Sequence, residues 1–266
     1  MASNEKPLKG YTVLVTRAPD QAHLFSEKII AAGGCPVEIP LIATRKTSTD
    51  DQIADLLKKL TKDDWVVFTS VNGVRYFLEH LHTLHIPLND VQNVNVACVG
   101  EKTKKAAERE GFLVSFYPKE FRAEALAEEL AKRAHQKSKI VIARGNLARP
   151  YLREELFNKG FHCLDFIVYE TIPLRNKEDE LANKILGKKV DFITFTSTST
   201  VSAFMEMVKK HKLENALQGI VFVCIGPVTR DAFLSYQISC TCLTPAIYTI
   251  DGMVEEMCAF IMKGRN

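Results

Sequence analysis

The stretch Trp65–Val74, WVVFTSVNGV, carries the pattern from which the fold can be predicted. Its first four residues, Trp65–Phe68, form a continuous apolar run rich in β-branched and aromatic side chains, which is typical of a parallel strand buried on both faces. Thr69 and Ser70 follow directly, and their hydroxyl groups are suited to accept from the free N–H groups of a first helical turn. After Gly73, apolar residues recur at helical spacing. The stretch therefore predicts a buried strand, a tight turn and a helix.

The same pattern returns further along the chain, in Asp191–Val201, DFITFTSTSTV. Phe68 and Phe195 hold equivalent places in the two stretches, an interval of 127 residues. The strand-like runs Val13–Arg17 and Ile140–Arg144 are separated by the same interval. A period of this length is far too long for a solenoid repeat, so each copy is of domain size. We infer that the chain is a tandem duplication of a β/α unit.

Composition and charge exclude several classes of protein. The 266 residues are 46% hydrophobic and 25% charged, as in an ordinary globular protein. The net charge of +3 is too small to indicate nucleic acid or an anionic membrane as a partner. No apolar run approaches the roughly 20 residues that a membrane span needs. A thin basic excess is compatible with an anionic small molecule as ligand.

Cysteine usage and the N-terminal stretch bear on the compartment. The seven cysteines include no CxxC motif, and Cys98 and Cys224 lie at equivalent places inside apolar runs. This pattern indicates buried, reduced thiols and a reducing compartment. The first ten residues, MASNEKPLKG, contain no apolar segment of the kind found in signal peptides. We therefore expect a cytoplasmic protein.

Apolar, β-branched runs alternate with helical patterns along the whole chain. Such alternation predicts an α/β fold with parallel sheets and right-handed crossovers. Pro40 lacks a donor N–H and indicates a sheet edge or an exit from the sheet. We expect a charged turn at Arg45–Asp51, a loop at His82–Asn89 and a helix at Phe121–Arg133. The expected strands are Tyr11–Thr16, Cys35–Leu41, Trp65–Phe68, Val94–Val99, Gly111–Phe116, Lys139–Ala143, Phe161–Thr171, Phe192–Phe195, Ile220–Ile225 and Ser239–Leu243.

Several motifs of cofactor and metal chemistry are missing from the sequence. It contains neither GxGxxG nor GxxxxGK[ST], which argues against a dinucleotide or a nucleoside triphosphate, and no GxSxG nucleophile elbow. His80, His82 and His85 cluster, but no cysteine or carboxylate motif accompanies them. We interpret these histidines as a solvated helix end, and we expect no metal and no cofactor.

Hydroxyl-bearing residues and glycines follow the carboxyl ends of four predicted strands. In open α/β sheets ligands bind at this edge, and a helix that starts there offers free N–H groups and a partial positive charge. Helix capping alone is the alternative interpretation for any one of these motifs. At Arg144 and Gly145, a ligand contact and a plain turn both remain open. The candidate ligand-binding residues are Thr69, Ser70, Gly100, Thr103, Arg144, Gly145, Thr196, Ser197, Gly226 and Thr229.

These motifs, in this order and spacing, resemble those of the uroporphyrinogen-III synthase family in its bacterial form, over essentially the whole chain. One departure is Thr200, since the second FTS motif of the family often continues with glycine at that place. The stretches that carry the resemblance are VLVTR (13–17), FTSVNGV (68–74), VGEKT (99–103), IARGN (142–146), VYET (168–171), FTSTSTV (195–201) and IGPVT (225–229).

The resemblance implies two flavodoxin-like domains with parallel sheets, joined by two crossing strands. It places residues 1–41 and 172–266 in the first domain and residues 42–171 in the second, so that the domains do not coincide with the sequence repeats. Pro40 and Pro173 punctuate the two proposed crossings.

The reaction that the resemblance implies is cyclisation of the linear tetrapyrrole hydroxymethylbilane to uroporphyrinogen III, with loss of water and inversion of the D ring, without a cofactor. Tyr169 resembles the functional tyrosine of the family, although a packed strand tyrosine is the alternative, and Thr103 resembles a residue tied to activity. We expect a monomer that has at most transient contact with the preceding enzyme of the pathway. The alternative is a non-catalytic ligand-binding or sensor protein for a polyanionic small molecule.

Overall fold

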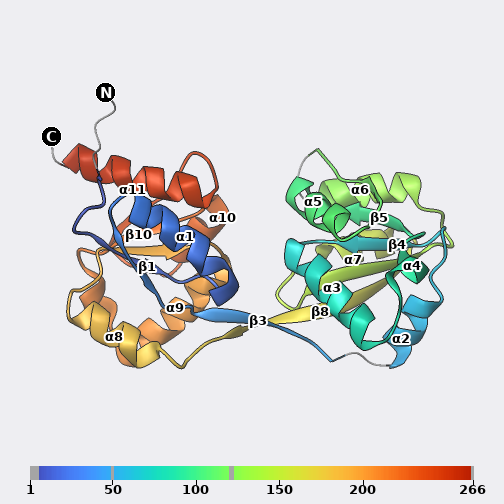
Figure 1. The fold of residues 1–266 in the computed structure, drawn as a ribbon, viewed down its shortest axis with the longest axis horizontal. Helices are drawn as coiled ribbons and strands as arrows, with labels where there is room; N and C mark the ends of the chain where they lie inside the picture. The colour runs from blue at the N-terminus through green and yellow to red at the C-terminus, as the bar shows by residue number, and fades with distance from the viewer. Residues whose placement is uncertain (1–5, 49–50, 120–122, 265–266) are drawn as a thin grey trace. The chain divides into compact units, whose positions relative to one another are not determined.

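The computed structural model describes residues 6–48, 51–119 and 123–264, and these fall into two compact units (Figure 1). Unit 1 comprises Met1–Ala43 and Ile172–Asn266, and unit 2 comprises Thr44–Thr171. The sequence prediction placed the limits after residue 41 and before residue 172, and this division into domains stays a prediction. Two predictions fall partly outside the described residues. Residues 1–5 belong to the N-terminal stretch that argued against a signal peptide, and residues 121–122 to the start of an expected helix.

Unit 1 contains a five-stranded parallel sheet in the order β11-β10-β9-β1-β2. Numbered along the chain within the unit, this is the strand order 2-1-3-4-5 of flavodoxin-like folds. The strands are β1 (Thr12–Val15), β2 (Cys35–Glu38), β9 (Phe192–Phe195), β10 (Val221–Cys224) and β11 (Thr241–Leu243).

Helices cover both faces of this sheet, which is why its central strands are apolar on both sides. One face packs Phe25, Met253 and Met257, and the other packs Phe204 and Phe233. The helices are α1 (Pro19–Ala31) and α11 (Ile250–Gly264) on the first face, and α8 (Glu178–Leu186), α9 (Thr198–His211), a 3₁₀ helix (Glu214–Leu217) and α10 (Pro227–Leu234) on the second.

Unit 2 contains a six-stranded sheet in the order β3-β8-β7-β4-β5-β6. The pairs from β8 to β6 are parallel. Hydrogen bonds from Leu174 N to Leu41 O and from Thr47 N to Val168 O show that β3 runs antiparallel to β8. The strands are β3 (Ile42–Lys46), β4 (Trp65–Phe68), β5 (Asn95–Cys98), β6 (Val114–Phe116), β7 (Lys139–Gly145) and β8 (His162–Pro173).

The helices of unit 2 also divide between the two faces of their sheet. Phe77 and Phe112 pack on one face, and Leu126, Leu130 and Leu156 pack on the other. The helices are α2 (Asp51–Lys58), α3 (Val71–Thr83), α4 (Leu88–Val91) and α5 (Glu101–Arg109) on the first face, and α6 (Ala123–Arg133) and α7 (Tyr151–Asn158) on the second.

Each sheet combines strands from both copies of the duplication. Strands β7 and β8 of the second copy stand beside β4, as β1 and β2 of the first copy stand beside β9. The order β8-β7-β4-β5-β6 thus repeats the order β2-β1-β9-β10-β11. The predicted fold class, two flavodoxin-like domains from an internal duplication, is confirmed.

The structure corrects several local expectations. Part of the predicted charged turn, Arg45–Asp51, belongs to strand β3, because an edge strand next to β8 needs no apolar alternation. The predicted loop His82–Asn89 contains the end of α3 and the start of α4. Strand β8 also extends to Pro173, two residues past the predicted end. No helix in the described ranges is both long and apolar enough to cross a membrane.

A fragment of residues 1–127 should fail to fold cooperatively. It contains β1 and β4 but lacks their neighbours β9 and β7, so a central strand of each sheet has no hydrogen-bonding partner on one side. We expect no cooperative urea transition by circular dichroism for this fragment, and a cooperative one for the control fragment of residues 42–173, which keeps all strands of the six-stranded sheet. Cooperative unfolding of the 1–127 fragment as a monomer would contradict the strand exchange.

Candidate functional site

The predicted serine and glycine motifs begin helices at the carboxyl ends of neighbouring strands. Ser70 caps α3, its Oγ accepting from Gly73 N at 2.9 Å, and Ser197 caps α9 in the same way, accepting from Thr200 N at 3.3 Å. Gly100 and Gly226 are the N-cap residues of α5 and α10. Because β4 lies next to β5, and β9 next to β10, each unit presents two adjacent helix N-termini. Such ends attract anions through free N–H groups.

The threonines of these motifs are less available than the backbone around them. Thr103 and Thr229, in the first turns of α5 and α10, are only 5% and 6% exposed. Thr69 is half-buried and donates to Ala143 O at 3.4 Å, and Thr196 is half-buried at the equivalent place in unit 1. Backbone N–H groups are therefore the better candidates for ligand contact, and the roles assigned to these threonines stay predictions.

Tyr169 is held in a cradle, which we define as Tyr76, Gly145 and Ser70 around its side chain. The Tyr76 ring stacks on it with a centroid separation of 5.2 Å and an interplanar angle of 22°. On Gly145, an added Cβ would lie 2.6 Å from Cζ of Tyr169, so only glycine leaves room for the ring. The Tyr169 Oη lies 3.4 Å from Ser70 Oγ. The structure therefore brings together three of the predicted residues, Ser70, Gly145 and Tyr169.

A β-bulge directs Tyr169 into this cradle. Arg144 pairs with Ile167, but the next residue, Gly145, pairs with Tyr169, which leaves Val168 as an extra residue in β8. Val168 is buried on the α3 face of the sheet, and strict alternation would place Tyr169 on the opposite face. The bulge instead lets Tyr169 pack on the α3 face as well.

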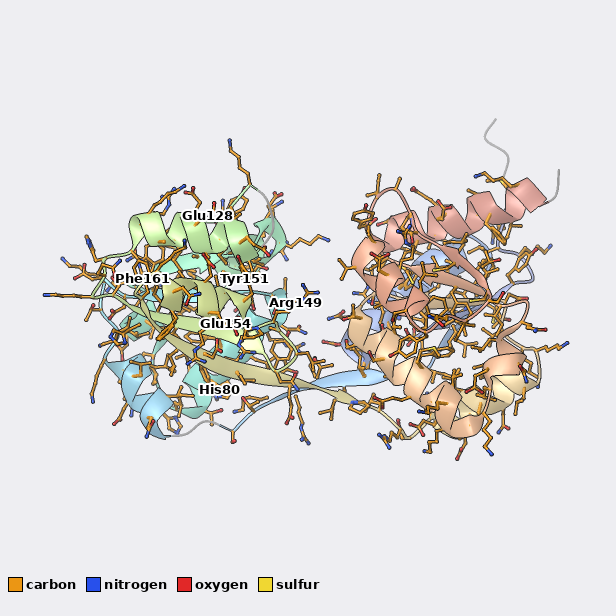
Figure 2. The ribbon with its side chains drawn as sticks, turned by 180° about the vertical axis from the view of Figure 1, so that it is seen from behind. His80, Glu128, Arg149, Tyr151, Glu154 and Phe161 are labelled. Atoms are coloured by element: carbon orange, nitrogen blue, oxygen red, sulfur yellow. The ribbon has the colours of Figure 1, made fainter. Side chains whose placement is uncertain are left out.

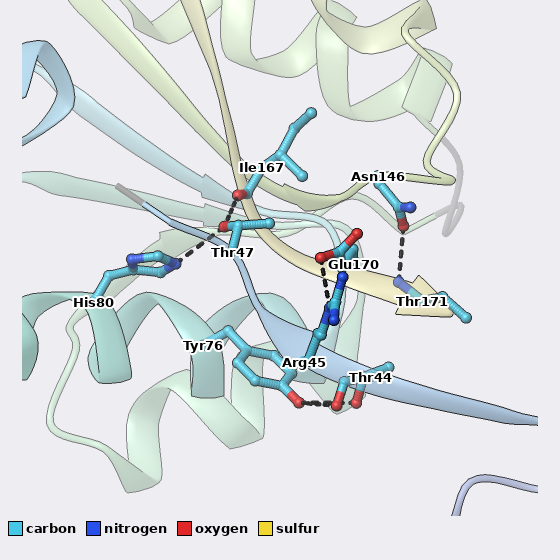
Figure 3. Close-up of polar contacts among 9 residues, drawn as sticks. All are labelled: Thr44, Arg45, Thr47, Tyr76, His80, Asn146, Ile167, Glu170 and Thr171. Atoms are coloured by element: carbon cyan, nitrogen blue, oxygen red, sulfur yellow. Dashed lines mark hydrogen bonds and ion pairs between the residues drawn. The ribbon is translucent and has the colours of Figure 1, made fainter. Parts of the chain in front are cut away.

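His80 fastens the carbonyl group of Val168 at this bulge. Its Nε2 lies 2.9 Å from Val168 O, and its ring packs on Phe166 at 4.8 Å. The same nitrogen lies 3.3 Å from Thr47 Oγ1 (Figure 3). The interpretation of a solvated helix end is wrong for His80, which is fully buried, although it fits the exposed His82 and His85. Burial lowers the pKa of His80, and nearby Lys46 acts in the same direction against the Val168 hydrogen bond.

Sequence reasoning missed His80 and Tyr76, although a signal was present. The two residues are four apart in α3 and therefore share one helix face, the face that Phe77 also carries into the core. Within the described ranges, no group of three or more His, Cys, Asp or Glu side chains is arranged to hold a metal ion.

Polar contacts tie α3 to β3, and tie β8 just after Tyr169 to β3 and to the residue that follows β7 (Figure 3). Tyr76 Oη donates to Thr44 O at 2.8 Å, and the Arg45 guanidinium pairs with Glu170 at 2.7 Å. Thr171 N donates to Asn146 Oδ1 at 2.9 Å. Together with the contact of His80 to Val168 O, these bonds hold β8 on both sides of Tyr169.

Arg144 is engaged inside unit 2. Its Nη1 donates to Gly145 O and Ala148 O, both at 3.2 Å, and its Nη2 donates to Asp165 at 2.8 Å. These bonds favour the turn interpretation for Arg144, whereas Gly145 serves as a contact surface for Tyr169.

Comparison with known proteins identifies the family. The profile of the family described as uroporphyrinogen-III synthase HemD matches residues 24–255. The chain belongs to the uroporphyrinogen-III synthase family. Members carrying the name uroporphyrinogen-III synthase are enzymes, lyases of heme biosynthesis, so membership favours the enzyme over the ligand-binding or sensor alternative.

Relatives from bacteria cover most of the chain. It is similar to the porphyrin biosynthesis protein HemD of Ruminiclostridium josui, with 26% identity over 95% of this chain, but it spans only about half (49%) of that relative. It is 29% identical to the uroporphyrinogen-III synthase of Chlorobaculum parvum, over 83% of this chain and 87% of that one.

Solved synthase structures share the fold. A mutant uroporphyrinogen III synthase from Thermus thermophilus gives a TM-score of 0.69 at 19% identity, covering 96% of this chain and all of that one. The enzyme from Helicobacter pylori gives 0.63 at 18% identity, covering 94% and 99%.

Within this member of the synthase family, the internal duplication allows the two units to be compared. At the interval of 127 residues, Ser70 corresponds to Ser197, so the helix cap is present in both units. The other positions of the cradle, and His80, differ: Tyr76, His80, Gly145 and Tyr169 correspond to Ala203, Met207, Ala18 and Ile42. The two copies therefore share the serine cap, and the tyrosine cradle belongs to unit 2.

Replacing Gly145 by alanine should displace Tyr169. The new Cβ overlaps the ring, which must leave the cradle, and such overpacking typically costs about 1–3 kcal/mol. We expect the rate of uroporphyrinogen III formation to fall at least about tenfold with the protein still folded. Gly264→Ala is the matched control, because its Cβ would meet nothing within 4 Å. Wild-type turnover in Gly145→Ala, measured beside the melting temperature, would refute the cradle.

His80→Phe should lower the free energy of unfolding and make it depend less on pH. Phe keeps the packing but leaves the Val168 carbonyl without the imidazole, at a cost of about 1–3 kcal/mol. Because the folded-state pKa of His80 is lowered, the unfolded chain takes up a proton first as pH falls below about 6.5, and stability present above that pH is lost.

Chemical unfolding at about pH 7.5 and about pH 5.5 tests this effect. The wild type should lose more unfolding free energy between the two than His80→Phe, while the exposed control His82→Gln keeps the wild-type loss. Equal losses in wild type and His80→Phe would show that His80 does not titrate on unfolding.

Proposed function

We propose that the chain converts hydroxymethylbilane into uroporphyrinogen III, closing the macrocycle with inversion of the D ring and loss of water. The observation that carries the proposal is the family match over residues 24–255. The cradle around Tyr169 supports it, because it fixes one ionisable hydroxyl group at the carboxyl edge of a sheet, where ligands bind in such folds.

The substrate carries acetate and propionate groups, and the helix N-termini suit carboxylates. In unit 2 the caps Ser70 and Gly100 begin α3 and α5, and in unit 1 Ser197 and Gly226 begin α9 and α10. Backbone N–H groups at these ends would bind the carboxylates, with the hydroxyls of Thr69, Thr196 and Thr229 in supporting positions. Main-chain donors need no side-chain ordering, which suits a ligand with many similar arms.

Tyr169 would act as the general acid for departure of the substrate hydroxyl. The phenol gives its proton to the leaving oxygen, the carbon–oxygen bond breaks with help from the pyrrole nitrogen, and water, an azafulvenium cation and a tyrosinate result. Ser70 Oγ, 3.4 Å from the phenol oxygen, is placed to hold the tyrosinate until it regains a proton.

The D ring would then attack through its substituted carbon, giving a spiro intermediate that fragments and recloses with the ring inverted. The pyrrole rings supply the electrons for every step, so we propose that neither a metal nor a cofactor takes part. Thr103, buried in the first turn of α5, would position that helix end.

We further propose that the protein works as a monomer in the cytoplasm and receives hydroxymethylbilane through transient contact with the preceding enzyme. Support for the compartment comes from the seven cysteines, all of which are free thiols.

Incubation with freshly prepared hydroxymethylbilane tests the function. After oxidation to porphyrins, chromatography separates isomer III from isomer I, which forms spontaneously. Isomer III above the background of a protein-free control is the expected result. Formation of isomer I alone would contradict the proposal and favour the alternative of a non-catalytic ligand-binding protein.

Tyr169→Phe should lower kcat more than any hydroxyl loss at the helix caps. General-acid catalysis typically contributes about 10²–10⁴-fold, whereas a neutral hydrogen bond is worth about 0.5–1.5 kcal/mol. Ser70→Ala, Thr196→Ala and Ser197→Ala should therefore cost about tenfold or less in kcat/KM. The phenyl ring keeps the stack with Tyr76, so the melting temperature should stay close to that of the wild type. Retention of more than about a third of kcat in Tyr169→Phe would remove the acid role.

A further inference from the structure

A cavity of about 200 Å³ lies in unit 2 between the sheet and the helices α6 and α7. Its wall is largely apolar, with Val99 and Ile142 from the sheet side and Leu126 and Leu152 from the helices. Whole small-molecule sites usually measure about 300–1,000 Å³, so this cavity suits one ring of a larger ligand. Thr69, one of the predicted binding residues, belongs to the same wall.

Two cationic side chains lie at this cavity with no acidic partner among the residues that the structure describes. Arg149 precedes α7 and Arg153 lies in its first turn, and both are exposed (Figure 2 labels Arg149). Neither forms an ion pair with any residue that the structure describes. Other exposed arginines on helices of this unit do pair with a neighbour, as Arg133 does with Glu129. Arg149 and Arg153 are thus free to bind carboxylates, which arginine does in a bidentate manner.

A buried ion pair forms the polar part of the wall. Arg144 and Asp165 are joined at 2.8 Å, with side chains 12% and 15% exposed. The Arg144 Nε and the Asp165 Oδ1 are buried and have no hydrogen-bond partner among the described residues. Unsatisfied buried polar atoms are rare, and here one donor and one acceptor remain beside an apolar cavity.

The charge around the cavity favours an anion. Asp165 is the one carboxylate among the described lining residues, and it is neutralised by Arg144. Glu124 and Glu128 of α6 lie near Tyr151, whose pKa is raised by desolvation and then by nearby carboxylates, but neither glutamate lines the cavity. Figure 2 shows Glu128 on α6 and Tyr151 at the start of α7.

The duplication shows that this arrangement belongs to one unit. At the interval of 127 residues, Arg149 and Arg153 correspond to Ala22 and Ser26 of α1, both buried in unit 1. Leu152 corresponds to Phe25, which is also fully buried. In unit 1 small and apolar side chains are buried at these positions, whereas in unit 2 two cations stand there, Arg149 before α7 and Arg153 in its first turn.

We propose that this cavity is a subsite for one pyrrole ring of the substrate, with the ring against the apolar wall and its two carboxylate arms on Arg149 and Arg153. The proposal rests on the proposed function and names where one end of the tetrapyrrole binds. It assigns the two arginines to substrate affinity, away from the bond-breaking chemistry at Tyr169.

Kinetics of Arg149→Met, Arg153→Met and the double variant test the assignment. Loss of uniform binding raises KM and leaves kcat unchanged, so we expect KM for hydroxymethylbilane to rise about tenfold for each single change, with kcat within about twofold. Arg109→Met on α5 is the matched control, since Arg109 is exposed and does not line the cavity. Wild-type KM in the double variant would overturn the subsite while leaving the function intact.

Direct binding separates this result from failure of the proposed function. Porphobilinogen, a single pyrrole with one acetate and one propionate arm, is titrated into protein labelled at its isoleucine and leucine methyl groups. The methyl signals of Leu126, Ile142 and Leu152 should shift in the wild type and not in the double variant. Absence of these shifts, or equal shifts with glutarate, which has two carboxylates and no ring, would overturn the proposal whether or not isomer III is formed.

Discussion

A parallel strand at the centre of a sheet must have a hydrogen-bonding neighbour on each side, and this constraint shapes the whole molecule. Strand β1 lies between β2 and β9, and β4 lies between β7 and β5. In both cases one neighbour comes from the other copy of the duplication. The chain therefore has to leave unit 1 through β3 and return through β8, the two strands in which the limits of the units fall. Neither copy can bury the centre of its sheet by itself.

Strand β8 carries a second consequence of this arrangement. It runs from unit 2 into unit 1, and its pairing with β7 ends at Tyr169. Just before this end, the bulge at Val168 interrupts the alternation of side chains between the two faces of the sheet. His80 satisfies the carbonyl of the extra residue, and Gly145 clears the space that the redirected tyrosine ring occupies. The side chain of Tyr169 is consequently held in one position, and packing against Tyr76 and Gly145 holds it rather than a network of charges.

The two copies share their helix caps but differ at the positions around Tyr169 and α7. Both keep the serine and glycine caps, since two adjacent helix N-termini attract carboxylates wherever they occur. The tyrosine cradle and the free arginines at α7 are found in unit 2, where small or apolar residues occupy the corresponding places of unit 1. The copies also differ at Thr200, whose hydroxyl donates to Ser197 O at 2.7 Å. The corresponding residue of unit 2 is Gly73, where an added Cβ would lie 3.0 Å from Ala143 O. The two halves of the duplication thus keep the same fold and the same caps but differ in the side chains at the carboxyl edge of the sheet.

The sequence by itself determined the α/β class, the duplication and most of the caps, because apolar runs, helical spacing and N-cap residues are local signals. Ser70 and Ser197 could be placed at helix starts from their neighbours alone. The same local signals could not reveal strand β3, whose polar residues form a strand because β8 lies beside it, nor the burial of His80, whose partner carbonyl is 88 residues away. The cradle and the cavity at α7 likewise depend on residues that only the sheet brings together. Tertiary structure decided these features because a hydrogen bond or a steric limit between distant residues leaves no periodicity in the sequence.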